Sequence, residues 1–283
     1  MKPNTPFSKK ILIIGATSGI GKALAMMYLK NNTTNIVGIA GRRTEKLKEI
    51  YDLHPARVRY RHMDVCTEEC TAIMQDLLNE MGGADLIIYC SGTGSHNEGP
   101  ALHPETEMPA VHTNVVGFTR IIIYAYNYFR KTGGGHFVTI ASVAGIRPLR
   151  QAPAYSATKR YKIHYTSALA AMAHRNKENI RFTTIKPGFI DTELLHRKYP
   201  FMVSLEKGKT QRNSSGQMAV DCTFMETDSF LGKVLKQLNR SRCHIMTGQK
   251  TYMAQIGLIC KNLGFLRTNM NTCITFDTDT YHL

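Results

Sequence analysis

Several features that would place this chain in other classes of protein are missing. The longest apolar run near the N-terminus, residues 11–16, is far too short to cross a bilayer. The first ten residues, MKPNTPFSKK, are basic but lack an apolar segment with a small-residue cleavage site, so we expect no secretory signal. The seven cysteines are odd in number and form no CxxC pair, which indicates a reduced intracellular protein with no metal site. The C-terminal YHL departs from the peroxisomal Ser-Lys-Leu signal at its first position, so we expect a cytoplasmic protein.

Acidic residues are scarce. The chain has 36 Lys and Arg against 21 Asp and Glu, a formal net charge of +15. Residues 1–61 hold twelve basic and three acidic residues, more than half of the excess. Such a surplus predicts an anionic partner. Nucleic acid is disfavoured, because no Lys/Arg run is interleaved with aromatic residues and no zinc-finger or RNP pattern occurs. A phosphorylated small molecule fits a local surplus better.

Short apolar segments alternate with longer segments of helical periodicity as far as about residue 190. The expected strands are residues 10–15, 35–40, 57–63, 84–90, 136–141 and 180–186. The expected helices include residues 22–30, 69–81, 104–131 and 154–176. This alternation is typical of an α/β fold with a Rossmann-like, doubly wound parallel sheet and helices on both faces. No internal repeat and no linker rich in Pro, Gly or Ser divides the chain, so we expect a single domain over residues 1–283 with its core at 8–192.

The alternation weakens after residue 191. Residues 193–226 are polar and predict a long substrate loop, and residues 227–283 predict a C-terminal extension. In that extension we expect a helix near 229–240, a strand at 243–248 and a tail. The apolar segment 251–266 favours a packed helix over a contact with a membrane.

A glycine-rich sequence, GATSGIG at residues 15–21, follows the first strand and opens a helix. Glycines at such a turn let the backbone approach a pyrophosphate, which the free N–H groups of the helix N-terminus attract. The pattern is G-x-x-x-G-x-G rather than the commoner G-x-G-x-x-G. The predicted cofactor-binding residues of this loop are Gly15, Thr17, Ser18, Gly19, Ile20 and Gly21.

The end of the second strand predicts which dinucleotide binds. A carboxylate there would bind the 2′-hydroxyl of NAD, whereas an arginine accommodates the 2′-phosphate of NADP. The sequence reads Ala40-Gly41-Arg42-Arg43, with no Asp or Glu before Glu45. Because a guanidinium binds phosphate with two parallel hydrogen bonds, we expect NADP(H) in preference to NAD(H).

The motifs that follow occur in a characteristic order. They are Asp64-Val65 after the third strand, YCSG at 89–92, Asn114, Ser142 in IASVAG, Tyr155 and Lys159 in YSATK, and PGFIDT at 187–192. With the glycine loop, this set resembles the short-chain dehydrogenase/reductase family over roughly residues 8–192. The fourth-strand motif of that family usually reads Asn-Asn-Ala-Gly. Ser91 and Gly92 keep the small residue and the glycine, whereas Tyr89 and Cys90 lose the two amides.

The chemistry of three of these residues follows from their spacing. Ser142 comes directly after the fifth strand, at the sheet edge where open α/β sheets bind ligands. Tyr155 and Lys159 are four residues apart and share one face of a helix. A free phenol has a pKa near 10, and a lysine cation within ~4–6 Å favours its phenolate form. Tyr155 is therefore predicted to be a proton donor for carbonyl reduction or a base for alcohol oxidation.

The family resemblance implies the remaining roles. Lys159 would also bind the nicotinamide ribose, Ser142 would hold the substrate oxygen, and Asn114 would position a water. The residues implied to contact the nicotinamide are Pro187, Gly188, Ile190 and Thr192, and those implied to contact the adenine are Asp64 and Val65. The small residues at 156–158 are interpreted as room for the cofactor and a neighbouring helix.

These observations predict an NADP(H)-dependent oxidoreductase that acts on a carbonyl compound or secondary alcohol. The alternatives are a non-catalytic dinucleotide-binding regulator, a nucleic-acid-binding protein suggested by the charge, and a nucleotide-sugar epimerase or dehydratase with the same Tyr-x-x-x-Lys pair. The spacing of Ser142 thirteen residues before Tyr155 favours simple redox chemistry. The apolar helices at 104–131 and 154–176, by resemblance, imply a homodimer or homotetramer.

Overall fold

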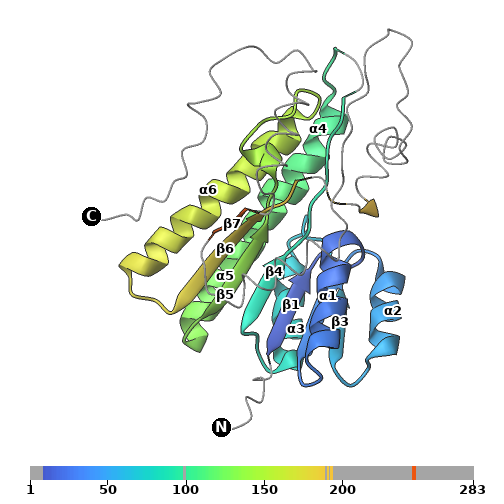
Figure 1. The fold of residues 1–283 in the computed structure, drawn as a ribbon, viewed down its shortest axis with the longest axis vertical. Coiled ribbons are helices and arrows are strands. Elements are labelled where there is room, and N and C mark those ends of the chain that lie inside the picture. Colours follow the sequence, from blue (N-terminus) through green and yellow to red (C-terminus); the bar gives the residue numbers. More distant parts are fainter. Residues whose placement is uncertain (1–8, 98–99, 189, 191, 194–243, 247–283) are drawn as a thin grey trace.

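A computed structural model describes residues 9–97, 100–188, 190, 192–193 and 244–246. Its strands form one parallel sheet in the order β3-β2-β1-β4-β5-β6-β7 (Figure 1). The strands are β1 Lys10–Ile14, β2 Ile36–Gly41, β3 Val58–His62, β4 Leu86–Tyr89, β5 Gly135–Ile140, β6 Ile180–Lys186 and β7 His244–Met246. The helices are α1 Gly19–Asn31, α2 Thr44–Leu53, α3 Cys70–Met81, α4 Pro104–Val111, α5 Phe118–Thr132 and α6 Pro153–Arg175, with a π-helix η1 at His112–Gly117 and a 3-10 turn η2 at Val143–Gly145.

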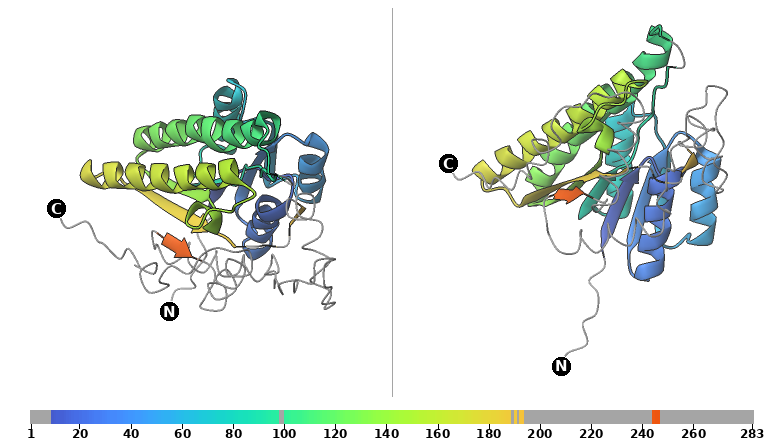
Figure 2. Two further views of the ribbon diagram at one scale, coloured as in Figure 1. Left: turned by 90° about the horizontal axis from the view of Figure 1, so that it is seen from above. Right: turned by 45° about the horizontal axis from the view of Figure 1, so that its top comes forward.

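The central strands are apolar along their whole length because helices cover both faces of the sheet. Residues 11–14 of β1 have no exposed surface. One face packs on α1 and α2 through side chains such as Leu24 and Leu47. The other packs on α3 and α5 through side chains such as Leu77 and Phe118. Figure 2 shows α5 and α6 side by side on this second face, and the hydroxyls of Thr119 and Tyr161 join them at 2.8 Å.

The order of the sheet reverses between β1 and β4. β1 pairs on one side with β2, with Ile11 opposite Val37, and on its other side with β4, with Ile11 opposite Leu86. The connections that leave these strands therefore diverge, and in doubly wound folds the ligand-binding crevice lies at the carboxyl ends of such strands.

The expected Rossmann-like architecture is confirmed. All six expected strands are present within one or two residues of their predicted ends, and β7 lies inside the strand expected at 243–248 and pairs in parallel with β6. The long helix expected at 104–131 is interrupted by the π-helical turn η1 at the buried Asn114. Apart from residue 193, the substrate loop expected at 193–226 lies outside the described residues, as do the helix expected at 229–240 and the segment at 251–266.

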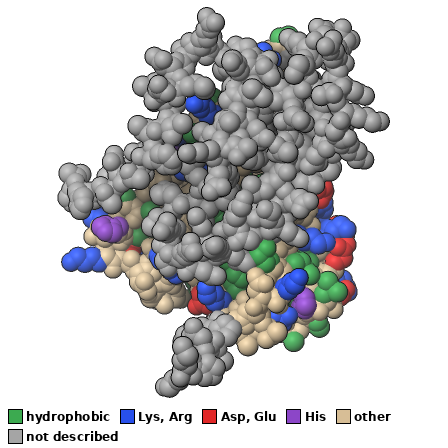
Figure 3. All heavy atoms as spheres, viewed as in Figure 1, with side chains coloured by type: hydrophobic (Ala, Val, Ile, Leu, Met, Phe, Trp, Pro, Cys, Tyr) green, Lys and Arg blue, Asp and Glu red, His purple; other side chains and the backbone are tan. Residues whose placement is uncertain are grey.

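No helix in the described ranges combines the length and the apolar character needed to cross a membrane. The part of the surface visible in Figure 3 carries Lys and Arg side chains at several separate places rather than in a single patch. Among the described residues there is also no cluster of His, Cys, Asp and Glu that could hold a metal ion.

A buried histidine makes the stability of this sheet dependent on pH. His136 of β5 is 7% exposed and its Nε2 lies 2.8 Å from Thr183 Oγ1. Burial, with smaller effects from Arg181 and Lys9, lowers the pKa of His136 to about 4. The unfolded chain, in which a histidine titrates near 6.5, therefore binds more protons than the folded chain between these two pH values. The contribution of the neutral His136 to the free energy of unfolding is therefore fully present above pH 6.5 and is lost as the pH falls to about 4.

We expect His136→Gln to remove the loss of stability that His136 causes at acid pH, because glutamine retains hydrogen-bonding groups but does not titrate. Wild type should lose roughly 3 kcal/mol more of its free energy of unfolding than the variant between pH 6.5 and pH 4. Urea denaturation at several pH values measures the difference, with the exposed His174→Gln as the control. An equal decline in wild type and His136→Gln would contradict the assignment.

Candidate active site

The glycine loop between β1 and α1 lies against the turn that follows β4. Gly15 has φ +91°, and a Cβ on it would lie 2.5 Å from the backbone nitrogen of Ser91. A Cβ on Gly21 would lie 2.1 Å from the carbonyl oxygen of Gly15. Any side chain at either position would therefore open the loop. The loop leads directly into α1, whose N-terminal N–H groups attract anions at the crevice.

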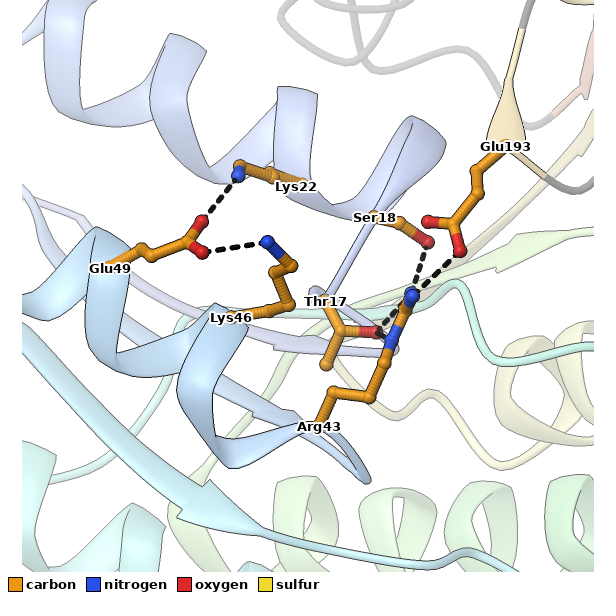
Figure 4. A network of polar contacts seen from close by, with 7 residues as sticks. All are labelled: Thr17, Ser18, Lys22, Arg43, Lys46, Glu49 and Glu193. Carbon is orange, nitrogen blue, oxygen red and sulfur yellow. Dashed lines mark hydrogen bonds and ion pairs between the residues drawn. The ribbon is translucent and has the colours of Figure 1, made fainter.

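Arg43, at the N-terminus of α2, extends its side chain over the glycine loop (Figure 4). Its guanidinium donates hydrogen bonds to Thr17 Oγ1 at 3.1 Å and to Ser18 Oγ at 2.7 Å. A third contact, at 2.7 Å, pairs Arg43 with Glu193. The neighbouring Arg42 is exposed. Arg43 thus combines a positive charge with two hydroxyl groups beside the end of β2, which is a donor set suited to a phosphate.

A second ionic group lies beside this one. Glu49 of α2 accepts from Lys22 of α1 at 3.1 Å and from Lys46 at 2.7 Å (Figure 4). These contacts join the first turns of α1 and α2. Together with Arg43 and its partner Glu193, they gather three basic side chains and two carboxylates at the N-terminal ends of the two helices.

Asp64 and Val65 lie just past the carboxyl end of β3. The Asp64 carboxylate accepts a hydrogen bond from the backbone N–H of Cys66 at 2.9 Å, which fixes the turn. Val65 is buried, and a Cβ on Gly117 of η1 would lie 2.7 Å from its side chain. Both residues therefore stand at the ligand-binding edge, as the sequence predicted.

Gly92 is the point where the polar groups of the site meet. A Cβ on Gly92 would lie 3.0 Å from Asn114 Oδ1, 3.5 Å from Lys159 Nζ and 3.7 Å from Lys162 Nζ. Asn114 is fully buried, and its amide donates to Thr93 O at 2.8 Å and accepts from Thr93 N at 3.1 Å. The absence of a side chain at Gly92 is what leaves room for an amide and two amines.

Asn114 is also tied to α6. Its Nδ2 donates to Thr158 Oγ1 at 3.0 Å, and that hydroxyl donates to the carbonyl of Tyr155 at 2.9 Å. The π-helical turn around Asn114 widens the helix at this contact, and such turns are frequent at functional sites. Asn114 therefore connects the turn after β4 to the helix that carries Tyr155.

Tyr155 and Lys159 occupy one face of α6, as their spacing predicted. Lys159 is 7% exposed, and its Nζ lies 5.4 Å from the centre of the Tyr155 ring. The same Nζ donates to the carbonyl of Ile140, the last residue of β5, at 3.4 Å. Tyr155 is half-buried, and its backbone N–H contacts Ser95 Oγ at 3.3 Å. This part of α6 is thus fixed to the ends of β4 and β5.

Ser142 caps the short turn η2 directly after β5. Its hydroxyl accepts from the backbone N–H of Ala144 at 3.1 Å. The N–H of Val143 donates to the carbonyl of Pro187 at 2.9 Å, which joins the Ser142 turn to the 187–192 motif. At the end of that motif, a Cβ on Gly19 would lie 3.4 Å from Thr192. Pro187 therefore contacts the Ser142 turn, and Thr192 lies beside the glycine loop.

Gly188 is half-buried in this motif, and Ile190 packs in the core beneath α1. Ile20, next to the second loop glycine, is partly buried against the same core cluster. Ile190 and Ile20 therefore belong to one core cluster.

Several residues of the site were not found from the sequence. Thr158 was interpreted as a spacer, yet it carries the hydrogen bond from Asn114. Glu107 of α4 accepts the N–H of Ala154 at 2.7 Å and so fixes the start of α6. Lys162 could have been noticed from its position, seven residues after Tyr155 on the same helical face. The contacts of Thr93, Ser95 and Glu107 depend on long-range folding, and no motif marks them.

Residues 9–202 match the family described as short chain dehydrogenase. The chain belongs to this family. An uncharacterised oxidoreductase of Myxococcus xanthus is 30% identical over 187 residues, which are 65% of this chain and 72% of that protein. An uncharacterised oxidoreductase of Staphylococcus haemolyticus is 28% identical over 188 residues, 66% of this chain and 80% of that protein.

Solved structures of other short-chain dehydrogenases share the fold. A Burkholderia phymatum short-chain dehydrogenase/reductase in complex with NAD has a TM-score of 0.72 at 19% identity, with 93% of this chain and 97% of that chain covered. Actinorhodin polyketide ketoreductase with NADPH has a TM-score of 0.70 at 22% identity, with 85% and 95% covered. Both nicotinamide cofactors thus occur in neighbours of this fold.

Three glycines let the glycine loop and the turn after β4 pack closely beside the N-terminus of α1. A Cβ on Gly15 would meet Ser91, one on Gly21 would meet Gly15, and one on Gly92 would meet Asn114. The residues on either side supply a basic group at Arg43 and a phenol and an amine at Tyr155 and Lys159. A phosphate-bearing ligand with a reactive end would therefore meet suitable groups at both ends.

Gly92→Ala should reduce the affinity for nicotinamide cofactor and disturb Asn114. The new methyl group would press on Asn114 Oδ1 and displace it by a few tenths of an ångström, and we expect about tenfold weaker binding or turnover. Gly94→Ala is the matched control, since its methyl group would meet only Tyr155 Cδ2 at 3.9 Å. Titration of cofactor fluorescence measures the affinity, and indistinguishable results for the two variants would refute the role of Gly92.

Proposed function

We propose that this protein is an NADP(H)-dependent oxidoreductase that interconverts a carbonyl compound and a secondary alcohol. The observation that carries the proposal is the meeting of Asn114 and Lys159 at Gly92, with Tyr155 on the adjoining turn of α6. The bound cofactor would supply or accept the hydride. The protein would supply a proton, hold the substrate oxygen and keep the reacting groups in place.

Each role is supported by the contacts of the residue concerned. Tyr155 would exchange the proton with the substrate oxygen, since its hydroxyl belongs to a half-buried ring beside the buried amine of Lys159. Lys159 would favour the phenolate form and bind the nicotinamide ribose. Ser142, fixed at the end of β5, would hold the substrate oxygen. Asn114 would hold the turn after β4 against α6, and it would also position a water.

A preference for NADP(H) is supported by Arg43. Its guanidinium already binds two hydroxyls of the glycine loop and one carboxylate, so it is directed toward a site for oxygen-rich groups. The 2′-phosphate would replace the Glu193 carboxylate as the anionic partner. Arg42 is exposed and close in sequence, and it would add a second positive charge.

The alternative of a non-catalytic dinucleotide-binding regulator would use the same glycine loop and Arg43. The presence of both Tyr155 and Lys159 at short range favours the enzyme. The substrate class within carbonyl compounds and alcohols is to be sought with a panel of steroids, quinones, sugars, acyl thioesters and aliphatic ketones, with NADPH oxidation as the readout.

We further propose a cytoplasmic homodimer or homotetramer. Apolar side chains remain exposed on the helices expected to pair: Val116 of η1 is 39% exposed, Ile123 of α5 43% and Met172 of α6 40%. A second copy of the chain would remove these groups from water.

Tyr155→Phe should retain NADPH binding and lose at least ~10² of turnover, because the variant keeps the ring but has no proton to exchange. Tyr165→Phe, on the same helix and ten residues further on, is the control and should keep its activity. Steady-state kinetics with a carbonyl substrate from the panel, together with a cofactor titration, make the comparison. Near-normal turnover in Tyr155→Phe would remove this tyrosine from the mechanism.

Arg43→Ala should weaken the binding of NADPH about tenfold or more and leave NADH almost unchanged, since charge-assisted hydrogen bonds to a phosphate are lost only for NADPH. Glu193→Gln removes the carboxylate that competes for Arg43 and should strengthen NADPH binding. Lys48→Ala, a cation one turn further along α2, is the matched control. Equal weakening of both cofactors by Arg43→Ala would contradict the assignment of the 2′-phosphate site.

A further inference from the structure

A second lysine, Lys162, lies inside the site, and no carboxylate among the described residues pairs with it. It is fully buried on α6, and its Nζ donates to the backbone carbonyl of Ser91 at 2.9 Å. The ammonium group lies 4.6 Å from the centre of the Tyr89 ring and 5.4 Å from that of Phe118. A lysine is almost never fully buried unless a charged group compensates for the lost hydration.

The elements packed around Lys162 present few groups that titrate. β4 and the residue after it contribute Tyr89 and Cys90, and burial raises the pKa of Tyr89 well above its usual range and that of Cys90 to about 12, so both are neutral at ordinary pH. The helices η1 and α5 contribute the uncharged Asn114 and Phe118. Among the described residues, no ion pair joins Lys162 to a carboxylate. Lys159, on its own helix, is the charged neighbour.

Lys162 and Lys159 are close enough to interact. Their two Nζ atoms lie 3.7 Å and 3.5 Å from the same point, the position that a Cβ on Gly92 would take. Two cations in a buried site repel one another. Burial and then the charge of Lys159 hold the pKa of Lys162 well below its usual range.

We propose that Lys162 is a positioning residue that acts through Lys159: its buried amine lies beside that of Lys159 at Gly92 and adds a second positive charge to the site only as the pH falls. The inference rests on the proposed function, in which Lys159 faces the nicotinamide end of the cofactor. Lys162 is thus a pH-dependent source of positive charge directly behind the catalytic amine.

The charge of the cofactor gives a readout that a purely structural lysine would not affect. The nicotinamide of NADP⁺ is cationic and that of NADPH is neutral. A second positive charge at Lys162 therefore weakens the binding of NADP⁺ more than that of NADPH. In wild type, the ratio of the dissociation constants of NADP⁺ and NADPH should rise at least about threefold as the pH is lowered from about 9 to 5.

Two substitutions separate the charge of Lys162 from its hydrogen bond. Lys162→Met removes both, and Lys162→Gln removes the charge but keeps an N–H donor for the carbonyl of Ser91. In both variants, the ratio of the dissociation constants of NADP⁺ and NADPH should not change with pH. A wild-type ratio that is equally flat, or a Gln variant that behaves as wild type while only the Met variant differs, would overturn the proposal.

Stability provides a second readout. The pKa of Lys162 is lowered in the folded chain, so the unfolded chain binds more protons, and the stability of wild type falls as the pH drops below about 10.4. The thermal midpoint of Lys162→Met should therefore exceed that of wild type, by a margin that widens toward acid pH. A midpoint below that of wild type at every pH would contradict a buried, uncompensated amine.

The titrations of NADP⁺ and NADPH binding are repeated in the Tyr155→Phe variant, because binding can be measured without turnover. If Tyr155→Phe alone remains active, the proposed function fails whatever Lys162 does. If Tyr155→Phe is inactive and the ratio in wild type does not depend on pH, only the role of Lys162 fails.

Discussion

The close approach of two backbone turns, the glycine loop after β1 and the turn after β4, is the constraint on which the site depends. Gly15 lies so near Ser91 that a Cβ between them would overlap the backbone. This contact brings the N-terminus of α1 to the same edge as Gly92. Gly92 in turn leaves the space into which Asn114, Lys159 and Lys162 project. The reversal of strand order at β1 and β4 places that contact at the crevice, so topology and glycine placement act together.

Burial then gives the polar groups of the site their properties. Lys159 and Lys162 are both buried on α6, and each donates a hydrogen bond to a backbone carbonyl. A carbonyl stabilises an amine without fixing its charge, whereas a carboxylate would hold it protonated. The site therefore keeps a net positive charge that an anionic or electron-rich ligand can neutralise, and the charge depends on pH.

The departure from the usual fourth-strand motif is connected with Lys162. The family resemblance implies two amides at positions 89 and 90, where this chain has Tyr89 and Cys90. The Tyr89 ring forms part of the wall on which the Lys162 ammonium lies, and its hydroxyl donates to Thr113 O at 3.1 Å. Tyr89, which stands where the family motif has an amide, and Lys162 are therefore packed against each other.

The sequence by itself determined the order of strands and helices, the glycine loop, and the shared face of Tyr155 and Lys159, because these follow from local periodicity and from spacing within one element. It also indicated Arg43, whose charge and position after β2 are local features. Only the tertiary structure decided the partners of Asn114, the closeness of Thr192 to Gly19, and the burial of Lys162 behind Lys159. The partners of Asn114, Lys162 and Gly19 lie 21 to 173 positions away in the sequence. Their geometry depends on how β1, β4 and α6 pack together, which no local pattern in the chain specifies.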